Sequence, residues 1–434
     1  MKKLERYFEF AALGADWRTE ILAGLTTFLT MAYIVFVNPA ILHDAGMPLA
    51  AVTAATCLSA AFASILMGAF ARYPIALAPG MGINAYFAYT VVKGMGIPWQ
   101  TALGAVFLSG VAFLILTAVG VRQLIVAAIP RDLYAAVAAG IGLFIALVGF
   151  HNAGIVVAHP QTLVTLGNLR APQTLLALFG LILTGGLMAR GVRAAMLIGI
   201  LATTAVGAAF GLVHWQPQTL HWSDLAATAF KLDVRAALHL GFIEVVFVFL
   251  FVDLFDNIGT LIGVTQKAGL IDRQGRIPRI DRILFTDATA TVAGSLTGTS
   301  TVVSYIESAA GIAAGGRTGV TAIVVGLLFL AALFVTPLAA IVPTAATAPA
   351  LIVVGSLMVS AVAEIRWSDP AVALPAFLTL AAIPLTSSIA NGIAFGFVSW
   401  TLIKLIRGEW RAVSWLVYLL TALFLARFVY LAKG

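Results

Sequence analysis

Stretches of about twenty apolar residues, the length that crosses a bilayer as a helix, follow one another along almost the whole chain. Hydrophobic residues make up 61% of the 434 and charged residues only 10%, whereas soluble domains carry roughly 45–50% apolar and about 25% charged residues. A core of this size cannot bury so large an apolar excess, so the solvent must be lipid. Within lipid every backbone polar group needs an internal partner, which a helix provides. The chain is therefore predicted to be an all-α polytopic membrane protein.

The apolar stretches fall into two groups of seven, separated by a polar break at 214–236. The predicted spans are 19–41, 50–71, 75–92, 100–120, 133–150, 172–189 and 193–213, then 240–263, 283–297, 302–316, 318–337, 347–363, 370–384 and 387–406. A further stretch at 412–430 is either an extra span or a helix at the interface. Because each group holds an odd number of spans, the two halves enter the membrane from opposite sides. This predicts fourteen transmembrane segments in a seven-plus-seven inverted repeat, as in many secondary transporters.

Lysine and arginine are distributed unevenly between the two sides of the membrane. With the N-terminus in the cytoplasm, the inner loops collect nineteen of these residues and the outer loops four, namely Lys93, Arg170, Lys231 and Arg235. Since cytoplasmic loops carry the excess of positive charge, this orientation is the predicted one. The start MKKLERYFEF has no compact apolar region and no small-residue cleavage site, so no removable signal peptide is expected. The short loops suit a cell membrane, and the bacterial inner membrane is favoured.

Two predicted spans at matching positions in the two halves do not read as continuous helices. The third, at 73–89, contains two prolines and two glycines, which weaken a helix. The tenth, at 294–311, is expected to be extended over 297–303 and helical from Ser304. An extended piece followed by a half-helix leaves free backbone N–H groups inside the membrane. Interrupted segments at matched positions therefore predict a binding site near the midplane.

Acidic residues inside the spans are the strongest candidates for function, because an acid at the bilayer centre costs about 2.5–3.5 kcal/mol on insertion scales. The eighth span carries Asp253 and Asp256, and their spacing of three places both on one helix face. Asn257 and Thr260 continue that face. Glu307 is expected in the first turn of the short helix of the tenth span, where the helix dipole favours a carboxylate.

Three other polar residues of the spans are weighed against these acids. Asn84 holds the early position in the third span that corresponds to Glu307 in the tenth. Asp287 and Glu244 lie nearer the ends of their spans, so they are interpreted as interfacial or structural.

The remaining residues argue against catalysis, metal binding and nucleic-acid binding. The six histidines lie in or near predicted loops without ligand spacing, so no metal site is expected. The single cysteine, Cys57, excludes an internal disulfide, and no phosphate-binding glycine loop is present. Asp253 and Asp256 share one helix, whereas an aspartyl protease needs two opposed aspartates. The net charge of +7 reflects scarce acids rather than a basic stripe. Neither an enzyme nor a cofactor is therefore expected.

Four sequence runs together resemble the AzgA-like purine permeases of the nucleobase–cation symporter 2 superfamily. They are TTFLTMAYIVFVNPAIL at 26–42, APGMGINAYF at 78–87, VDLFDNIGT at 252–260 and ESAAG at 307–311. The resemblance implies a core domain, formed by 1–130 and 237–340, that moves against a gate domain formed by 131–236 and 341–434, the last including the C-terminal apolar segment. It also implies uptake of adenine, guanine and hypoxanthine with a proton, by elevator-like alternating access, in a homodimer.

The resemblance carries the family's binding positions onto matching residues of this chain. Gly82 and Asn84 match the third-span site, Asp253 and Asp256 the pair of the eighth span, and Glu307 the acid of the tenth. Asn84, Gly82, Asp253 and Glu307 are accordingly expected to bind the purine. Asp256 and Glu307 are expected to support proton coupling or to hold the eighth span against the tenth.

Several points stay open at this stage. Tyr86, Phe87, Phe251 and Tyr305 are all candidates to stack on the base. The alternative substrates are uracil or xanthine, transported by a permease of the same superfamily. A sulfate or dicarboxylate carrier is disfavoured because three acids would repel an anion, and a passive channel is disfavoured by interrupted helices with acids at their centre.

Overall fold

The computed structural model describes residues 2–120, 129–213, 225–239, 245–267, 270, 277–339 and 341–431. Within these ranges, seven helices are long and apolar enough to cross a membrane, and four further apolar helices are shorter. Part of the predicted polar break, with His214, His221 and Asp224, lies outside the described residues, as does Glu244. The side chain of Asp256 is also outside them.

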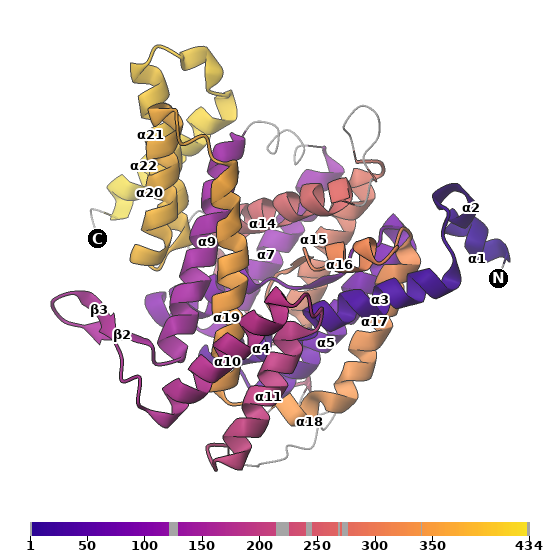
Figure 1. The fold of residues 1–434 in the computed structure, drawn as a ribbon. Coiled ribbons are helices and arrows are strands. Elements are labelled where there is room, and N and C mark those ends of the chain that lie inside the picture. The colour runs from indigo at the N-terminus through magenta and orange to yellow at the C-terminus, as the bar shows by residue number, and fades with distance from the viewer. Residues whose placement is uncertain are drawn as a thin grey trace.

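The described elements of the first half follow the predicted spans closely (Figure 1). Two short helices, α1 (Lys2–Tyr7) and α2 (Phe10–Leu13), precede them. The elements that correspond to the predicted spans are α3 (Trp17–Met31) with α4 (Ile34–Asp44), α5 (Leu49–Leu66) with the π-helix η1 (Met67–Ala71), β1 (Leu77–Pro79) with α6 (Met81–Ala85) and the π-helix η2 (Tyr86–Gly94), α7 (Trp99–Ala118), α9 (Arg131–Asn152), α10 (Pro172–Ala189) and α11 (Ala195–Ala209). A hairpin of β2 (Val156–His159) and β3 (Leu163–Leu166) connects α9 to α10.

The described second half has a similar order of elements, with a short strand and half-helix at the matching place. The elements of the second half are α13 (Val234–His239), α14 (Val246–Lys267), α15 (Ile280–Thr297), β4 (Val302–Ser304) with α16 (Ser308–Ala313), α17 (Gly319–Ala332) with η3 (Leu333–Val335) and α18 (Thr336–Ala339), α19 (Thr344–Val359) with η4 (Ser360–Glu364), α20 (Pro370–Leu385) and α21 (Ile389–Ile406). The C-terminal apolar stretch forms η5 (Trp410–Ala412) and α22 (Trp415–Leu431), and α22 packs on α21.

Both predicted extended stretches are present, but the boundaries in the tenth span differ from the prediction. Helix α15 continues to Thr297, and Gly298 ends it in a left-handed conformation. The short helix begins at Ser308 rather than Ser304, because Val302–Ser304 pair with another strand and their backbone is therefore extended. Glu307 is consequently the residue that precedes α16, not a member of its first turn.

Proline marks where many of the helices begin. Its missing N–H group costs nothing in the first turn, whose N–H groups have no helical partner, and its fixed φ suits that position. Prolines stand immediately before or at the first residue of six helices: Pro48, Pro98, Pro130, Pro172, Pro343 and Pro370. Proline therefore favours the starts of these six helices, which the prediction had placed from the apolar stretches alone.

The helices pack in two groups. In the first, α5 packs on α17, α7 on α15 and α3 on α17. In the second, α9 packs on α19 and α20, α10 on α11 and α19, and α20 on α21; Figure 1 shows α9 and α19 side by side. At the α9–α19 crossing, a Cβ atom on Gly142 would lie 2.7 Å from the carbonyl oxygen of Gly355. Small residues thus let the two backbones touch, as in other helix pairs within membranes.

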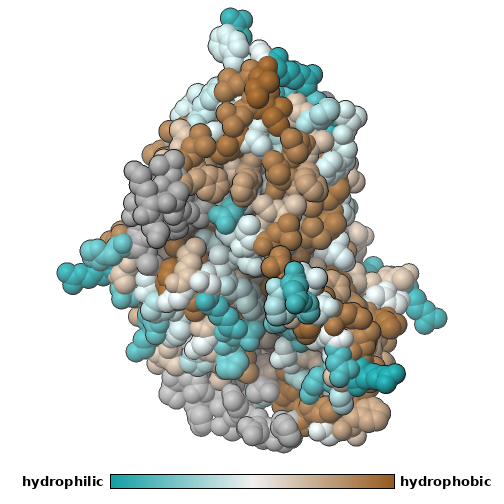
Figure 2. Space-filling model, turned by 90° about the vertical axis from the view of Figure 1, so that its left-hand side faces the viewer, coloured by the Kyte–Doolittle hydropathy of each residue, from teal (hydrophilic) through white to brown (hydrophobic). Residues whose placement is uncertain are grey.

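The surface is rich in large apolar side chains. Ile182, Phe334, Leu385 and Ile406 are between 73% and 89% exposed, and Figure 2 shows apolar residues over broad areas of one face. A soluble monomer rarely exposes large contiguous apolar areas. Together with the long apolar helices, this confirms an all-α membrane protein.

A buried carboxylate that sequence reasoning missed holds the connection between α16 and α17. Glu20, in α3, is completely buried. Its Oε1 accepts from the amides of Arg317 (2.8 Å) and Thr318 (3.0 Å), and its Oε2 accepts from the amide (3.2 Å) and hydroxyl (2.5 Å) of Thr321. The carboxylate therefore satisfies N–H groups at the start of α17 that lack a helical partner.

We expect Glu20→Ala to lower the free energy of unfolding by roughly 3 kcal/mol or more, because it leaves several buried donors unpaired. Thermal and denaturant unfolding in detergent measure the loss. Glu5→Ala is the matched control: it removes a less buried acceptor for Trp17 Nε1 (2.9 Å) and should cost at most about 1 kcal/mol. Equal stability of the two variants would contradict the role of Glu20.

Candidate functional site

Two short strands from the two halves of the chain meet inside the protein. Strand β1 pairs antiparallel with β4, with Leu77 opposite Ser304 and Pro79 opposite Val302. The pairing is extended by bonds from the amide of Gly80 to the carbonyl of Thr301 (2.9 Å) and from the amide of Tyr305 to that of Ala76 (3.0 Å). Backbone groups that a continuous helix would satisfy are thus bonded across the pair. The half-helices α6 and α16 leave from opposite ends of this ribbon.

A cavity of about 270 Å³ lies between this ribbon and helices α9 and α19 of the second packing group. Its apolar walls come chiefly from α9 and α19, and its polar side chains include Tyr33, Thr260, Ser304, Glu307 and Glu364. The volume is near the lower end for small-molecule pockets. Glu364, at the end of η4, is exposed, so an acid that sequence reasoning missed stands where the cavity meets the outside of the protein.

Glu307 lies in this cavity and is held by a residue from the first predicted span. The hydroxyl of Tyr33, between α3 and α4, donates to Glu307 Oε1 at 2.9 Å. Hydrogen bonds to an ionised carboxylate are among the stronger ones in proteins. The bond fixes one oxygen of the acid. Tyr33 lies within the run at 26–42, but nothing in the sequence pairs it with Glu307.

Gly82, in α6, also lines the cavity, and its lack of a side chain is required there. A Cβ atom at this position would lie 2.5 Å from Cγ2 of Ile141 in α9, which is closer than real Cβ atoms approach a neighbour. Gly82 therefore allows α6 to approach a helix of the other packing group.

Asn84 is placed differently from the other predicted site residues and does not line this cavity. Its Nδ2 donates to Asn38 Oδ1, and its Oδ1 accepts from Ser300 Oγ. Asn38 in turn donates to Thr56 (2.7 Å) and Thr299 (3.1 Å). In this conformation the amide of Asn84 joins α6 to α4, α5 and the segment before β4. Its contact with a substrate stays a prediction.

Helix α14 contributes to the site through one face. Asp253 and Asn257 are both completely buried on it, while Thr260, one turn further, lines the cavity. Asp253 therefore lies on the same helix as Thr260 but is not part of the cavity wall. The role of Asp256, whose side chain is outside the described residues, stays a prediction.

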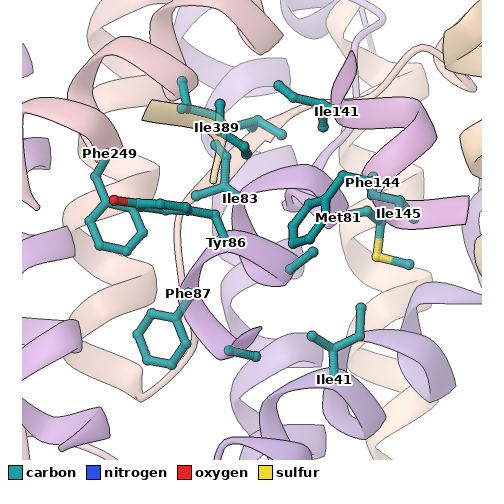
Figure 3. Packing of buried hydrophobic residues seen from close by; sticks show 14 of the residues in the cluster. Ile41, Met81, Ile83, Tyr86, Phe87, Ile141, Phe144, Ile145, Phe249 and Ile389 are labelled. Atoms are coloured by element: carbon teal, nitrogen blue, oxygen red, sulfur yellow. The ribbon is translucent and has the colours of Figure 1, made fainter. Parts of the chain in front are cut away.

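The four aromatic residues that could stack on a base differ in where they lie. Tyr305 lines the cavity and its hydroxyl donates to the carbonyl of Pro79 at 2.5 Å. Tyr86 lies edge-on to Phe249, with ring centroids 5.2 Å apart, deep in the core (Figure 3). Phe87 lies beside the ring of Phe249. Phe251 packs on Phe247, with ring centroids 4.3 Å apart. Among the four, only Tyr305 lines this cavity.

The far end of the interface between the packing groups is closed by contacts from η2. The hydroxyl of Tyr89 donates to Asp44 Oδ2 (2.7 Å) and accepts from Asn152 Nδ2 (3.3 Å). The hydroxyl of Thr90 donates to the carbonyl of Ser387 (2.6 Å), in the turn between α20 and α21. Asn152 ends α9, whereas the cavity lies near the start of α9. The contacts of η2 thus join the two packing groups near the end of α9, and the cavity lies between them near its start.

The polar groups of the cavity can hydrogen-bond a small organic molecule. In the part of the chain that the structure describes, no three His, Cys, Asp or Glu side chains are grouped closely enough to hold a metal ion. The cavity instead combines an acceptor, Glu307, with hydroxyls and an aromatic ring. A carboxylate and hydroxyls of this kind can accept N–H groups from a small molecule, and an aromatic ring can stack on a flat one.

Sequence comparison places the chain among transport proteins over nearly its full length. Residues 18–395 match the model of a family described as a permease family. The chain is 46% identical over 428 residues to the adenine permease AdeP of Escherichia coli (strain K12), which covers 99% of this chain and 96% of the relative. It is 45% identical over 447 residues to the guanine/hypoxanthine permease PbuG of Bacillus subtilis (strain 168), covering 99% and 100%.

Comparison with solved structures finds a similar fold in another membrane protein. The transmembrane domain of a cyanobacterium bicarbonate transporter, BicA, superposes with a TM-score of 0.67, covering 87% of this chain and 97% of that chain. The sequences are 14% identical, so this likeness concerns the fold alone.

Proposed function

The chain belongs to the permease family matched over residues 18–395, as its resemblance to the AzgA-like permeases indicated, and we propose on this premise that it imports purine nucleobases by proton symport. Relatives named for adenine and for guanine/hypoxanthine align with it from end to end. The observation that carries the proposal is the Glu307 carboxylate, held by Tyr33 in a cavity beside the ribbon of the two interrupted spans.

The chemistry of the cavity supports a purine. A carboxylate accepts hydrogen bonds, and guanine offers it N1–H and an exocyclic N–H, whereas hypoxanthine offers N1–H alone. Adenine presents a different edge and binds in a shifted pose or with a proton. Tyr305, the aromatic of the cavity wall, is the proposed stacking partner. A site of this kind discriminates well, because a mismatched ligand leaves buried groups unpaired.

Proton coupling is proposed to use the carboxyls of the eighth and tenth spans. Glu307 and Asp253 are proposed to bind the purine, although in this conformation Glu307 lines the cavity and Asp253 does not. One acid of the set that includes Asp256 is proposed to take up the proton. A charged group is costly inside a bilayer. Protonation removes the negative charge of a carboxylate, so the site that holds a proton crosses the membrane more easily than the site without one.

Movement of a core domain against a gate domain is proposed for alternating access. The core would comprise 1–130 and 237–340, and the gate 131–236 and 341–434, in a fold of fourteen spans with the N-terminus in the cytoplasm. The separate packing of α5 with α17 and of α9 with α19 supports this division. The cavity then faces the cytoplasm, and the contacts of η2 close the outer side. A homodimer in the cell membrane is the proposed assembly.

Uptake into proteoliposomes tests the function. Saturable uptake of radiolabelled hypoxanthine that needs an inward proton gradient, and that unlabelled adenine and guanine suppress, is the expected result. Hypoxanthine uptake that does not depend on the proton gradient would refute the proposed proton coupling but not the proposed substrate. Transport of uracil or xanthine by folded protein, with no uptake of adenine, guanine or hypoxanthine, would refute the proposed substrates.

A further inference from the structure

Glu364, at the end of η4, is an acid of the cavity wall that the fold itself does not use. The residue is exposed and lines the cavity, so its carboxylate stands at the boundary between the cavity and the solvent. No hydrogen bond or ion pair joins this carboxylate to another residue in the described part of the chain. Its charge can therefore act on a molecule that enters the cavity.

The charged groups packed around η4 do not neutralise Glu364. η4 packs on α9 and α19, and α19 carries no charged residue. At the start of α9, Asp132 accepts from the amide (3.1 Å), Nε (3.2 Å) and Nη2 (2.5 Å) of Arg366. The arginine that follows Glu364 in the sequence is thus paired with another carboxylate. The other charged or titratable groups of α9 apart from its tyrosine, Arg131 at its start and His151 at its far end, do not line the cavity.

The described wall of the cavity offers acids and no cation. Besides Glu364, its ionisable side chains are Glu307 and the tyrosines Tyr33, Tyr134 and Tyr305. Tyrosine is ordinarily neutral near physiological pH, since its reference pKa is about 10. A cleft with apolar walls and charges of one sign concentrates molecules of the opposite charge and disfavours those of the same charge. An anion is therefore the least suitable ligand for this cavity.

We propose that Glu364 is a specificity-determining residue, whose charge disfavours purines that have lost a proton; this inference rests on the proposed function. A neutral base has no net charge for the carboxylate to repel, whereas an anionic base of the same shape is repelled. Repulsion needs no direct contact, because charges interact over several ångströms where water is partly displaced. Glu364 thus discriminates by charge, while Glu307 and Tyr305 are proposed to bind and stack on the base.

The test compares two bases of nearly equal shape. Guanine stays neutral at slightly alkaline pH, whereas 8-azaguanine, with a ring nitrogen in place of C8–H, loses a proton near neutral pH. Kd values for both are measured in detergent, by competition against radiolabelled hypoxanthine, from slightly acid to slightly alkaline pH. In the unmodified protein, the ratio of the 8-azaguanine Kd to the guanine Kd should rise with pH. At alkaline pH we expect this ratio to be about fivefold lower in Glu364→Gln, and high salt should narrow the difference between the two proteins.

Two further variants at the same position separate charge from structure. Glu364→Asp should keep the discrimination, and Glu364→Lys should lower the ratio below that of Glu364→Gln, an order that a merely structural role would not produce. Glu5→Gln is the matched control, because it removes a carboxylate that does not line the cavity, and it should leave the ratio unchanged.

The outcomes distinguish the inference from the proposed function. Equal ratios in the unmodified protein, Glu364→Gln and Glu364→Lys would overturn the inference alone. If the folded, unmodified protein binds neither hypoxanthine nor guanine, the proposed function and the inference fail together.

Discussion

We expect Glu307→Gln to abolish the proposed proton-driven purine uptake, while the protein still reaches the membrane in folded form. Glutamine keeps the size of the side chain and an oxygen that can accept from Tyr33, so the bond at 2.9 Å need not be lost. It removes the negative charge and the ability to take up a proton. A neutral amide also presents an N–H₂ group to the N–H groups of the base, which leaves donors facing donors.

The measurement is initial-rate uptake in proteoliposomes, normalised to folded protein. Uptake by Glu307→Gln or Glu307→Ala should fall to the level of empty vesicles. Glu409→Gln is the matched control, because Glu409 bonds Lys404 (2.5 Å) in the connection after α21 and not in the cavity. Asp253→Ala in the same assay separates the two predicted acids. Full uptake by Glu307→Gln would show that the carboxylate is not needed.

We expect a disulfide between positions 90 and 387 to stop transport, and a reductant to restore it. Thr90 Oγ1 lies 2.6 Å from the carbonyl oxygen of Ser387, and the two residues belong to different packing groups. If the core moves against the gate, this contact must open once in every cycle. A covalent bond there holds the outer side closed and prevents exchange.

The design is simple because the chain has a single cysteine, Cys57. Thr90→Cys and Ser387→Cys are combined in a Cys57→Ser background, and uptake is measured after oxidation and again after reduction. The control pair is Thr401→Cys with Thr421→Cys, whose hydroxyls are 2.7 Å apart within the second packing group. Cross-linking there should leave uptake intact. Uptake that continues with the 90–387 bond formed would exclude motion at this interface.

Much of the fold could be predicted because lipid solvent makes the local sequence informative. A run of about twenty apolar residues is needed to span the bilayer, and prolines such as Pro98 and Pro130 mark where helices begin. The start of α16 was placed four residues too early, because strand pairing with β1 depends on a distant segment that local propensity does not report.

The site was only partly predictable for the same reason. Glu307 and Gly82 stand out locally, as an intramembrane acid and a glycine in a broken helix. The partner of Glu307, Tyr33, lies 274 positions away along the chain, and no periodicity connects them. Glu20 and Glu364 were missed because each sits close to a span end, where an acid is ordinary. Their importance comes from what packs around them.

The ribbon of β1 and β4 also has a consequence for biogenesis. Its two strands are completed by different halves of the chain, and an unbonded backbone group in hydrocarbon costs several kcal/mol. During translation the segment around Leu77–Pro79 is made long before its partner Val302–Ser304. When the first half has left the ribosome, the backbone bonds of this segment are therefore still incomplete, and they are made only when the second half arrives. Neither half expressed alone can complete this segment, but two halves made as separate polypeptides can do so when they meet.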